Sequence, residues 1–247
     1  MKKSIVIGLM LVGFCCSGRG WAAENTLLVF AGAGLRVPLD EIAAQFEAEN
    51  GVHVVYDYEG DGRLGNKILA GQKPDLFIPG GEKWAQQLKK QGQIKSISPL
   101  AYHIPVILTP LHNTKVNALQ DFTNNGVRLA LGDPGACAIG RVSEQVLEKA
   151  GLGEDELNVV ARGATVKQLV HWVEFNNADA TITWHADGVQ SNKVRIIPIP
   201  SEFTRLETIP ACEMNDAPHP DLAAKYTTYL LDHGSAVFKR HGFGNME

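Results

Sequence analysis

Short apolar runs along this chain alternate with segments in which apolar residues recur every three or four positions. Residues 27–31 form an unbroken apolar run, and a turn at residues 32–34 leads into a segment with the helical period over residues 37–50. Gly51 follows that segment, and glycine readily adopts the left-handed conformation in which many helices end. The pattern therefore predicts a buried strand, a turn and an amphipathic helix.

Hydrophobic positions later in the chain repeat this unit. Further strands are expected over residues 52–56, 74–79, 127–131, 159–162 and 180–184, and further helices over residues 63–70, 82–91, 165–175, 221–233 and 235–241, with another helix that ends at Ala150. Strands that alternate with helices in this way are typical of an α/β fold with a largely parallel sheet.

Two apolar segments link the repeated units into separate blocks. Residues 104–108 and 194–199 are continuous strand-like runs, and each lies between two groups of strand–helix units. We expect two α/β lobes, one made of residues 23–103 and 198–247 and the other of residues 104–197. A cleft between such lobes is a common place for a small ligand.

The first residues have the pattern of a cleaved targeting segment. Two lysines follow Met1, residues 4–16 are almost entirely apolar, and the small residues Gly20 and Ala22 suit signal peptidase. The apolar run is too short to span a bilayer comfortably. We therefore expect residues 1–22 to be removed after Ala22, which leaves an exported protein without a membrane anchor.

Composition sharpens this picture. The chain has 247 residues with 45% hydrophobic and 20% charged residues, which excludes wholesale disorder. The formal net charge is −4. Loss of residues 1–22 would remove three basic residues and no acidic ones, so the mature protein is still more acidic and unsuited to general nucleic-acid binding.

The four cysteines do not indicate a disulfide-built scaffold or a lipid anchor. Cys15 and Cys16 lie in the targeting segment, and neither follows the small residue that a lipid-attachment site normally has. Cys137 and Cys212 remain in the mature chain. They could form a disulfide in an oxidising compartment or be two buried thiols, and the sequence leaves both possibilities open.

Five stretches follow one another in a fixed order over nearly the whole mature chain. They are VFAGAGL at residues 29–35, FEAENGV at 46–52, AGQKPDLFI at 70–78, RLALGDP at 128–134 and FKRHGF at 238–243, with Gly140 and Arg141 after the fourth. In these stretches the sequence resembles the periplasmic molybdate/tungstate-binding proteins of ABC importers. The resemblance implies a two-lobed, type II-like binding-protein fold in which each lobe has a mostly parallel sheet flanked by helices.

The resemblance also implies a function. Such a protein is a monomer that binds a small inorganic ligand, delivers it to an ABC permease in the inner membrane, and needs neither a cofactor nor nucleic acid. It is a binding protein and not an enzyme. The sequence agrees, since it contains no phosphate-binding loop, nucleophile elbow or zinc-protease motif.

The family holds its oxyanion with hydroxyls, with backbone N–H groups at helix starts and with a tyrosine. The matching positions here are Gly34, Asp61, Ile139, Val166 and Trp184. Free N–H groups and the helix dipole attract anions at a helix start, so Ile139 and Val166 can serve with any side chain. Gly34 and Asp61 stand where the family has serines, and Trp184 stands near the family tyrosine.

Asp61 is the departure with the largest chemical consequence, because an ionised carboxylate accepts hydrogen bonds and repels an anion. It could cap the helix that begins near Arg63 and be neutralised by Arg63 or Arg36. It could instead contact a cationic ligand, with help from the oxygen-rich residues 56–59.

His185 and Cys137 add a second interpretation of the site. His185 follows a predicted strand at the edge where α/β proteins bind ligands, and it could donate to an oxyanion, bind a metal or be structural. Cys137 lies in a turn that the resemblance places at the cleft, and it could equally be a small buried residue. Together with Asp61 they would form a mixed set of ligands suited to a transition metal.

Two hypotheses for the ligand follow. The first is a small oxyanion of the molybdate/tungstate type, held in the interlobe cleft by Gly34, Asp61, Ile139, Val166, Trp184 and His185. The alternative is a transition-metal ion bound for uptake or sensing by Asp61, Cys137 and His185.

Overall fold

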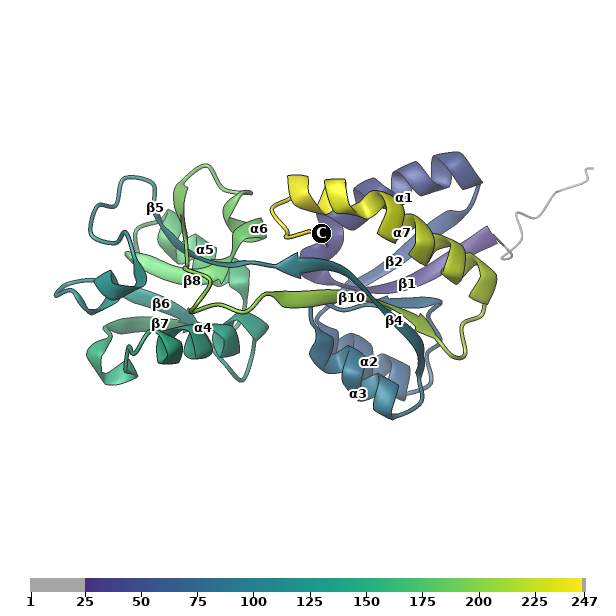
Figure 1. Ribbon diagram of the computed structural model, residues 1–247, viewed down its shortest axis with the longest axis horizontal. Coiled ribbons are helices and arrows are strands. Elements are labelled where there is room, and N and C mark those ends of the chain that lie inside the picture. The colour runs from purple at the N-terminus through teal and green to yellow at the C-terminus, as the bar shows by residue number, and fades with distance from the viewer. Residues whose placement is uncertain (1–24, 246–247) are drawn as a thin grey trace, which may run out of the picture.

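The computed structural model describes residues 25–245 and contains two five-stranded sheets, each flanked by helices (Figure 1). The strand order is β2-β1-β3-β10-β4 in one lobe and β7-β6-β8-β5-β9 in the other. The expected targeting segment, residues 1–22, and its cleavage point lie outside the described residues. Within residues 25–245, no helix combines the length and apolar character needed to cross a membrane.

The first lobe contains the sheet that begins the described chain. Its strands are β1 (Thr26–Gly32), β2 (His53–Glu59), β3 (Leu76–Ile78), β4 (Ile94–His103) and β10 (Glu207–Met214). Its helices are α1 (Arg36–Asn50), which follows a short 3-10 turn η2 (Ala33–Leu35), α2 (Asp61–Leu69), α3 (Glu82–Lys90) and α7 (Pro220–Arg240).

The second lobe has the same plan. Its strands are β5 (Pro105–Pro110), β6 (Leu129–Gly132), β7 (Val159–Gly163), β8 (Ala180–Trp184) and β9 (Val194–Pro198). Its helices are α4 (Ala138–Lys149), α5 (Val166–Glu174) and α6 (His185–Gly188), with 3-10 turns η3 (Leu119–Thr123) and η4 (Glu154–Glu156).

In each sheet four strands run in one direction and a single strand is reversed. β10 is antiparallel to both of its neighbours, β3 and β4, and β5 is antiparallel to both β8 and β9. Each reversed strand enters its sheet from the other lobe, since the chain crosses from β4 to β5 and returns from β9 to β10 (Figure 1). We propose the lobe division that the sequence predicts, with residues 23–103 and 198–247 in one lobe and residues 104–197 in the other.

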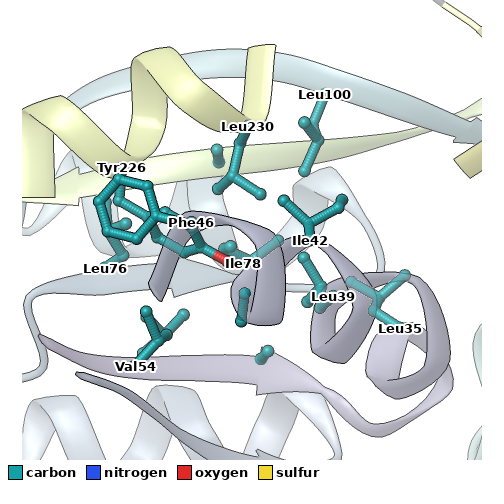
Figure 2. Packing of buried hydrophobic residues seen from close by; sticks show 14 of the residues in the cluster. Leu35, Leu39, Ile42, Phe46, Val54, Leu76, Ile78, Leu100, Tyr226 and Leu230 are labelled. Carbon is teal, nitrogen blue, oxygen red and sulfur yellow. The ribbon is translucent and has the colours of Figure 1, made fainter. Parts of the chain in front are cut away.

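The core of the first lobe explains the periodicity of α1. Leu35, Leu39, Ile42 and Phe46 lie along one side of the helix and are fully buried (Figure 2). They pack against the sheet and against α7, where the ring of Tyr226 lies 4.7 Å from that of Phe46. Repeats of three and four residues place these side chains on one face, so their burial holds α1 and α7 on the same side of the sheet.

Three elements of the structure, β4, β10 and α7, differ from the sequence prediction. β4 and β10 were not predicted, and each contains a proline; Pro99 and Pro210 are paired at a register irregularity, where a missing N–H is tolerated. Residues 221–233 and 235–241, expected as two helices, form the single helix α7. Gly234 does not break it, because α7 passes close to Ile42 and Leu100 at that point, and an added Cβ would lie 3.5 Å from Ile42 Cδ1.

Candidate ligand site between the lobes

The starts of the helices gather at one edge of each sheet. In the first lobe β1, β2 and β3 are parallel neighbours, and their carboxyl ends lead into η2 with α1, α2 and α3. In the second lobe β6, β7 and β8 are likewise parallel and lead into α4, α5 and α6. The carboxyl edge of such a sheet is the usual ligand-binding edge of an α/β protein.

The two edges meet across the lobes. The His103 ring, at the end of β4, stacks on the Trp184 ring, at the end of β8, with ring centroids 4.7 Å apart. Phe243, beyond α7, lies on His103 as well, at 5.2 Å. These contacts place the ends of β4 and β8 on the two sides of one interlobe junction.

Asp61 lies at this junction as the first residue of α2, and it is partly buried. Its Oδ1 accepts a hydrogen bond from the Gly80 N–H at 3.0 Å. A Cβ on Gly32 would lie 3.1 Å from Oδ1 and 3.0 Å from the Gly80 nitrogen, so the absence of a side chain at Gly32 lets these three segments approach. Burial raises the pKa of Asp61 to about 6 against the opposing effect of the Gly80 N–H.

Asp61 does not act as the helix cap that one sequence interpretation required. The N-cap of α2 is Gly60, and no side chain caps the helix. The two arginines expected to neutralise Asp61 are engaged elsewhere: Arg63 pairs with Glu59 at 3.6 Å, and Arg36 lies over the Tyr58 ring at 4.2 Å.

His103 brings an uncharged polar ring to the same place. It is only 7% exposed, and its Nδ1 has no hydrogen-bond partner among residues 25–245. Its Nε2 and the Oδ2 of Asp61 both lie 3.7 Å from the position that a Cβ on Gly80 would take. Burial lowers the pKa of His103 to about 3, so the ring is neutral at neutral pH, with one donor and one acceptor nitrogen.

Glu207 and Arg141 complete the charged groups of the junction. Glu207 is directly opposite His103 in the β10–β4 pairing, and its carboxylate lies against Gly81 at the start of α3. Burial raises the pKa of Glu207, while the Glu82 N–H and the positive charge of Arg141 oppose the rise. Arg141, in α4 of the second lobe, also opposes the rise at Asp61. One arginine of the second lobe therefore acts on two carboxylates of the first.

The second lobe offers backbone donors at its helix starts. The Ile139 side chain is fully buried in the second-lobe core and the Val166 side chain packs on that core, so neither can reach a ligand. Val166 is the first residue of α5 and Ile139 the second of α4. N–H groups in the first turn of a helix lack acceptors within the helix, so both are free to bind an anion.

Gly34 has free space around it, whereas Trp184 is packed against a neighbour. Gly34 is exposed, and a Cβ there would meet nothing within 4 Å, so the position that resembles the family serine has room for a side chain. Trp184 is buried and is occupied by its stacking with His103. It supplies a wall of the junction where the family has a hydroxyl.

The structure does not assemble the transition-metal set of the alternative hypothesis. Cys137 Sγ lies 3.5 Å from the carbonyl oxygens of Asp133 and Gly163, and His185 Nδ1 lies 2.8 Å from the Gly242 carbonyl oxygen. Across residues 25–245, no three His, Cys, Asp or Glu side chains are grouped so that they could hold a metal ion. Cys137 and His185 therefore contact other neighbours and are not grouped with Asp61.

The two mature cysteines are free thiols and do not form a disulfide. Cys137 precedes α4 in the second lobe, whereas Cys212 is fully buried in β10 of the first. Burial raises the pKa of Cys212 to about 12, so its thiol is inert.

The oxygen-rich residues 56–59 are also engaged within the first lobe. Tyr56 and Tyr226 share a hydrogen bond of 2.5 Å between their hydroxyls, and the Tyr58 hydroxyl donates to Asp40 at 2.7 Å. Lys67 pairs with Asp57 at 2.6 Å and with Glu59 at 3.1 Å. These groups stabilise β2 against α1, α2 and α7 and do not form a cation site.

Sequence reasoning missed Glu207, Gly80 and Asp187. Glu207 and Gly80 gave no signal, because β10 was not predicted and Gly80 lies in a short turn after β3. Asp187, in α6, is partly buried; burial raises its pKa to about 6, and Lys167 opposes the rise. A cavity of about 180 Å³ adjoins Glu207 between the lobes, lined by Glu82, Val142, Gln145, Val146, Lys149, Phe203, Arg205 and Glu207.

A family model for bacterial extracellular solute-binding proteins matches residues 27–244. The chain belongs to this family. It is 28% identical over 245 residues to the molybdate-binding protein ModA of Escherichia coli, a match that covers 94% of each chain. It is 24% identical over 209 residues to the molybdate-binding protein ModA of Haemophilus influenzae, which covers 81% of each chain.

A solved structure has the same fold as this solute-binding protein. The periplasmic molybdate-binding protein of Azotobacter vinelandii superposes with a TM-score of 0.76 at 20% identity, over 90% of this chain and 100% of the other. The resemblance to the molybdate/tungstate-binding family is confirmed by these matches, and so is the two-lobed α/β fold that it implied.

Proposed function

We propose that this solute-binding protein is the periplasmic component of an ABC importer and binds a small tetrahedral oxyanion of the molybdate/tungstate type between its lobes. The main support is the position of four helix starts. The starts of α1 and α2 lie at the carboxyl edge of the first sheet, those of α4 and α5 lie at the carboxyl edge of the second, and the two edges meet at the interlobe junction. Helix starts attract anions through free N–H groups and the helix dipole. Membership of the family and the names of the relatives support the same assignment.

The mechanism requires binding and movement but no covalent chemistry. The N–H groups of Ile139 and Val166 donate to the oxyanion from the second lobe, while Gly34 and Asp61 meet it from the first. The strands that cross between the lobes bend, and the ligand stabilises the closed form, because only that form contacts it on both sides. The closed form is then recognised by a permease of the inner membrane.

The proposal includes the setting in which the protein works. Cleavage after Ala22 releases the mature chain into the periplasm, where it acts as a monomer without nucleic acid. Catalysis forms no part of this role.

A thermal-shift panel on residues 23–247 tests the proposal. The panel contains molybdate, tungstate, sulfate, phosphate and a series of divalent metal ions. A ligand that binds only the folded state at about 100 times its Kd adds about 2.7 kcal/mol to the free energy of unfolding, so the melting temperature rises by several degrees. We expect at least one oxyanion to raise it. Stabilisation by divalent metals alone would support the alternative hypothesis and refute this one.

A further inference from the structure

We propose that the oxyanion carries a proton, as hydrogen phosphate does, and that Asp61 selects it by accepting a hydrogen bond from that O–H group. This inference rests on the proposed function, because it specifies the ligand of the same interlobe site. It adds a chemical class: a tetrahedral anion with the size of molybdate that can also donate a hydrogen bond.

The position of Asp61 gives the first argument. Gly80 already donates to Oδ1, whereas Oδ2 faces the space beside Gly80 that the Nε2 of His103 also borders. An ionised carboxylate can only accept hydrogen bonds, so the ligand atom that approaches Oδ2 must be a donor. Molybdate, tungstate and sulfate carry no proton at neutral pH and cannot satisfy this oxygen.

His103 supplies an independent argument that the space beside Asp61 takes a polar ligand. Its ring is more than nine-tenths buried, Nδ1 has no partner among the described residues, and Nε2 lies 3.7 Å from the position that a Cβ on Gly80 would take. Buried polar groups in proteins are nearly always hydrogen-bonded. A neutral imidazole can donate to one ligand oxygen, which a carboxylate cannot do.

The charge balance of the junction supports the same class. Arg141 is the cation whose charge acts on Asp61, and its Nη1 is already bonded to the Pro134 carbonyl oxygen at 3.3 Å. A fully deprotonated dianion would therefore face an ionised carboxylate that no nearby ion pair neutralises, and like charges at contact repel strongly. A protonated anion meets the same repulsion but offsets it with an O–H···O⁻ hydrogen bond, which belongs to the strong, charge-assisted class. The raised pKa of Asp61 still leaves it ionised above pH 7.

Calorimetric titration at pH 7.5 tests the selection. Wild type, Asp61→Ser and Asp57→Asn are titrated with inorganic phosphate, glycerol phosphate, sulfate and molybdate. We expect wild type to bind inorganic phosphate about tenfold to hundredfold more tightly than sulfate or molybdate, which is the range for one hydrogen bond to a charged group. Asp61→Ser is expected to lose most of that preference. Asp57→Asn, a carboxylate change on β2 where Lys67 is the partner, should retain it.

The outcomes separate this inference from the proposed function. If molybdate or sulfate binds wild type as tightly as phosphate, Asp61 does not select for a proton, although the oxyanion site stands. If no oxyanion binds either wild type or Asp61→Ser while both are folded by circular dichroism, the proposed function fails as well. Glycerol phosphate is a phosphate monoester and has lost its last acidic proton at pH 7.5, so preference for inorganic phosphate over it supports the inference. Preference for glycerol phosphate would show that Asp61 does not select the protonated oxyanion.

Discussion

At the scale of single residues, the buried carboxylate of Asp61 lowers the stability of the fold, although the proposed function uses it to bind the ligand. Its carboxylate is partly buried, and the one hydrogen bond from Gly80 does not replace the water it has lost. Burial raises its pKa from the ordinary value of 3.8 to about 6, so the folded protein holds this proton more tightly than the unfolded chain does. Such a group weakens the fold at neutral pH.

We predict that Asp61→Asn increases the free energy of unfolding at pH 8 by about 1–2 kcal/mol, because the amide removes a buried charge and can still accept from Gly80. The folded-state pKa is raised, so the wild type loses stability as pH rises from about 4 to about 6. The gain from the substitution therefore grows over that interval and disappears below it. Urea unfolding at pH 4, 6 and 8 measures the difference.

Other groups that face Asp61 define the control for this experiment. Burial also raises the pKa of Glu207 on β10 and lowers that of His103 on β4, and Arg141 on α4 opposes the rise at both Asp61 and Glu207. Glu207→Gln in the same series separates its contribution from that of Asp61. An Asp61→Asn effect of equal size at pH 4 and pH 8 would show that burial of the charge is not its cause.

At the scale of elements, α2 is held in place by close packing on α3, and this packing positions Asp61. A Cβ on Gly65 would lie 2.1 Å from Trp84 Cε3, so the helix can approach the indole only because this residue has no side chain. Gly62, one turn earlier, is different: a Cβ there would lie 3.5 Å from Trp84 Nε1, which is ordinary contact. Gly62 is therefore a matched control for a substitution at Gly65, because both glycines lie in α2 and face Trp84.

We predict that Gly65→Ala destabilises the protein by about 1–3 kcal/mol, as overpacking of a core does. Gly62→Ala should be neutral or stabilise it by up to about 1 kcal/mol, because alanine is the better helix former. Thermal unfolding of both variants at one pH measures the contrast. Equal effects of the two substitutions would mean that α2 does not pack on Trp84 as described.

The elements also show what local sequence patterns can and cannot predict. β1, α1 and β8 were predictable because the hydrophobic period that identifies them is also the pattern that their core buries. β4 and β10 were not, since Pro99 and Pro210 are unfavourable in strands and are tolerated only through their mutual pairing. The same limit applies to the site: strand ends locate Gly34, Asp61 and Trp184, whereas the pairing of His103 with Glu207 joins residues far apart in sequence.

At the scale of the whole molecule, the two lobes are joined by the crossing strands and by a contact between α6 and the segment after α7. His185 and Ala186 at the start of α6 pack against Gly242 after α7, and the His185 Nδ1 lies within hydrogen-bond distance of the Gly242 carbonyl oxygen. This contact joins α6 of the second lobe to the segment after α7 in the first.

The central claim is that backbone N–H groups at helix starts hold the oxyanion, and Val166 allows a direct test. Val166 is the first residue of α5, where proline fits a helix well, and Thr165 before it has φ −139° and ψ 151°, which a following proline favours. Val166→Pro therefore deletes one N–H and retains the helix. Val166→Ala is the matched control, because it also loses the side chain but keeps the N–H.

Calorimetric titration of wild type, Val166→Pro and Val166→Ala with phosphate, and separately with molybdate, measures what that single N–H contributes. For the anion that binds wild type, we predict that Val166→Pro weakens binding about tenfold or more, as expected for one hydrogen bond to a charged group, while Val166→Ala binds as wild type does. Equal affinity of Val166→Pro and Val166→Ala for that anion would contradict the account.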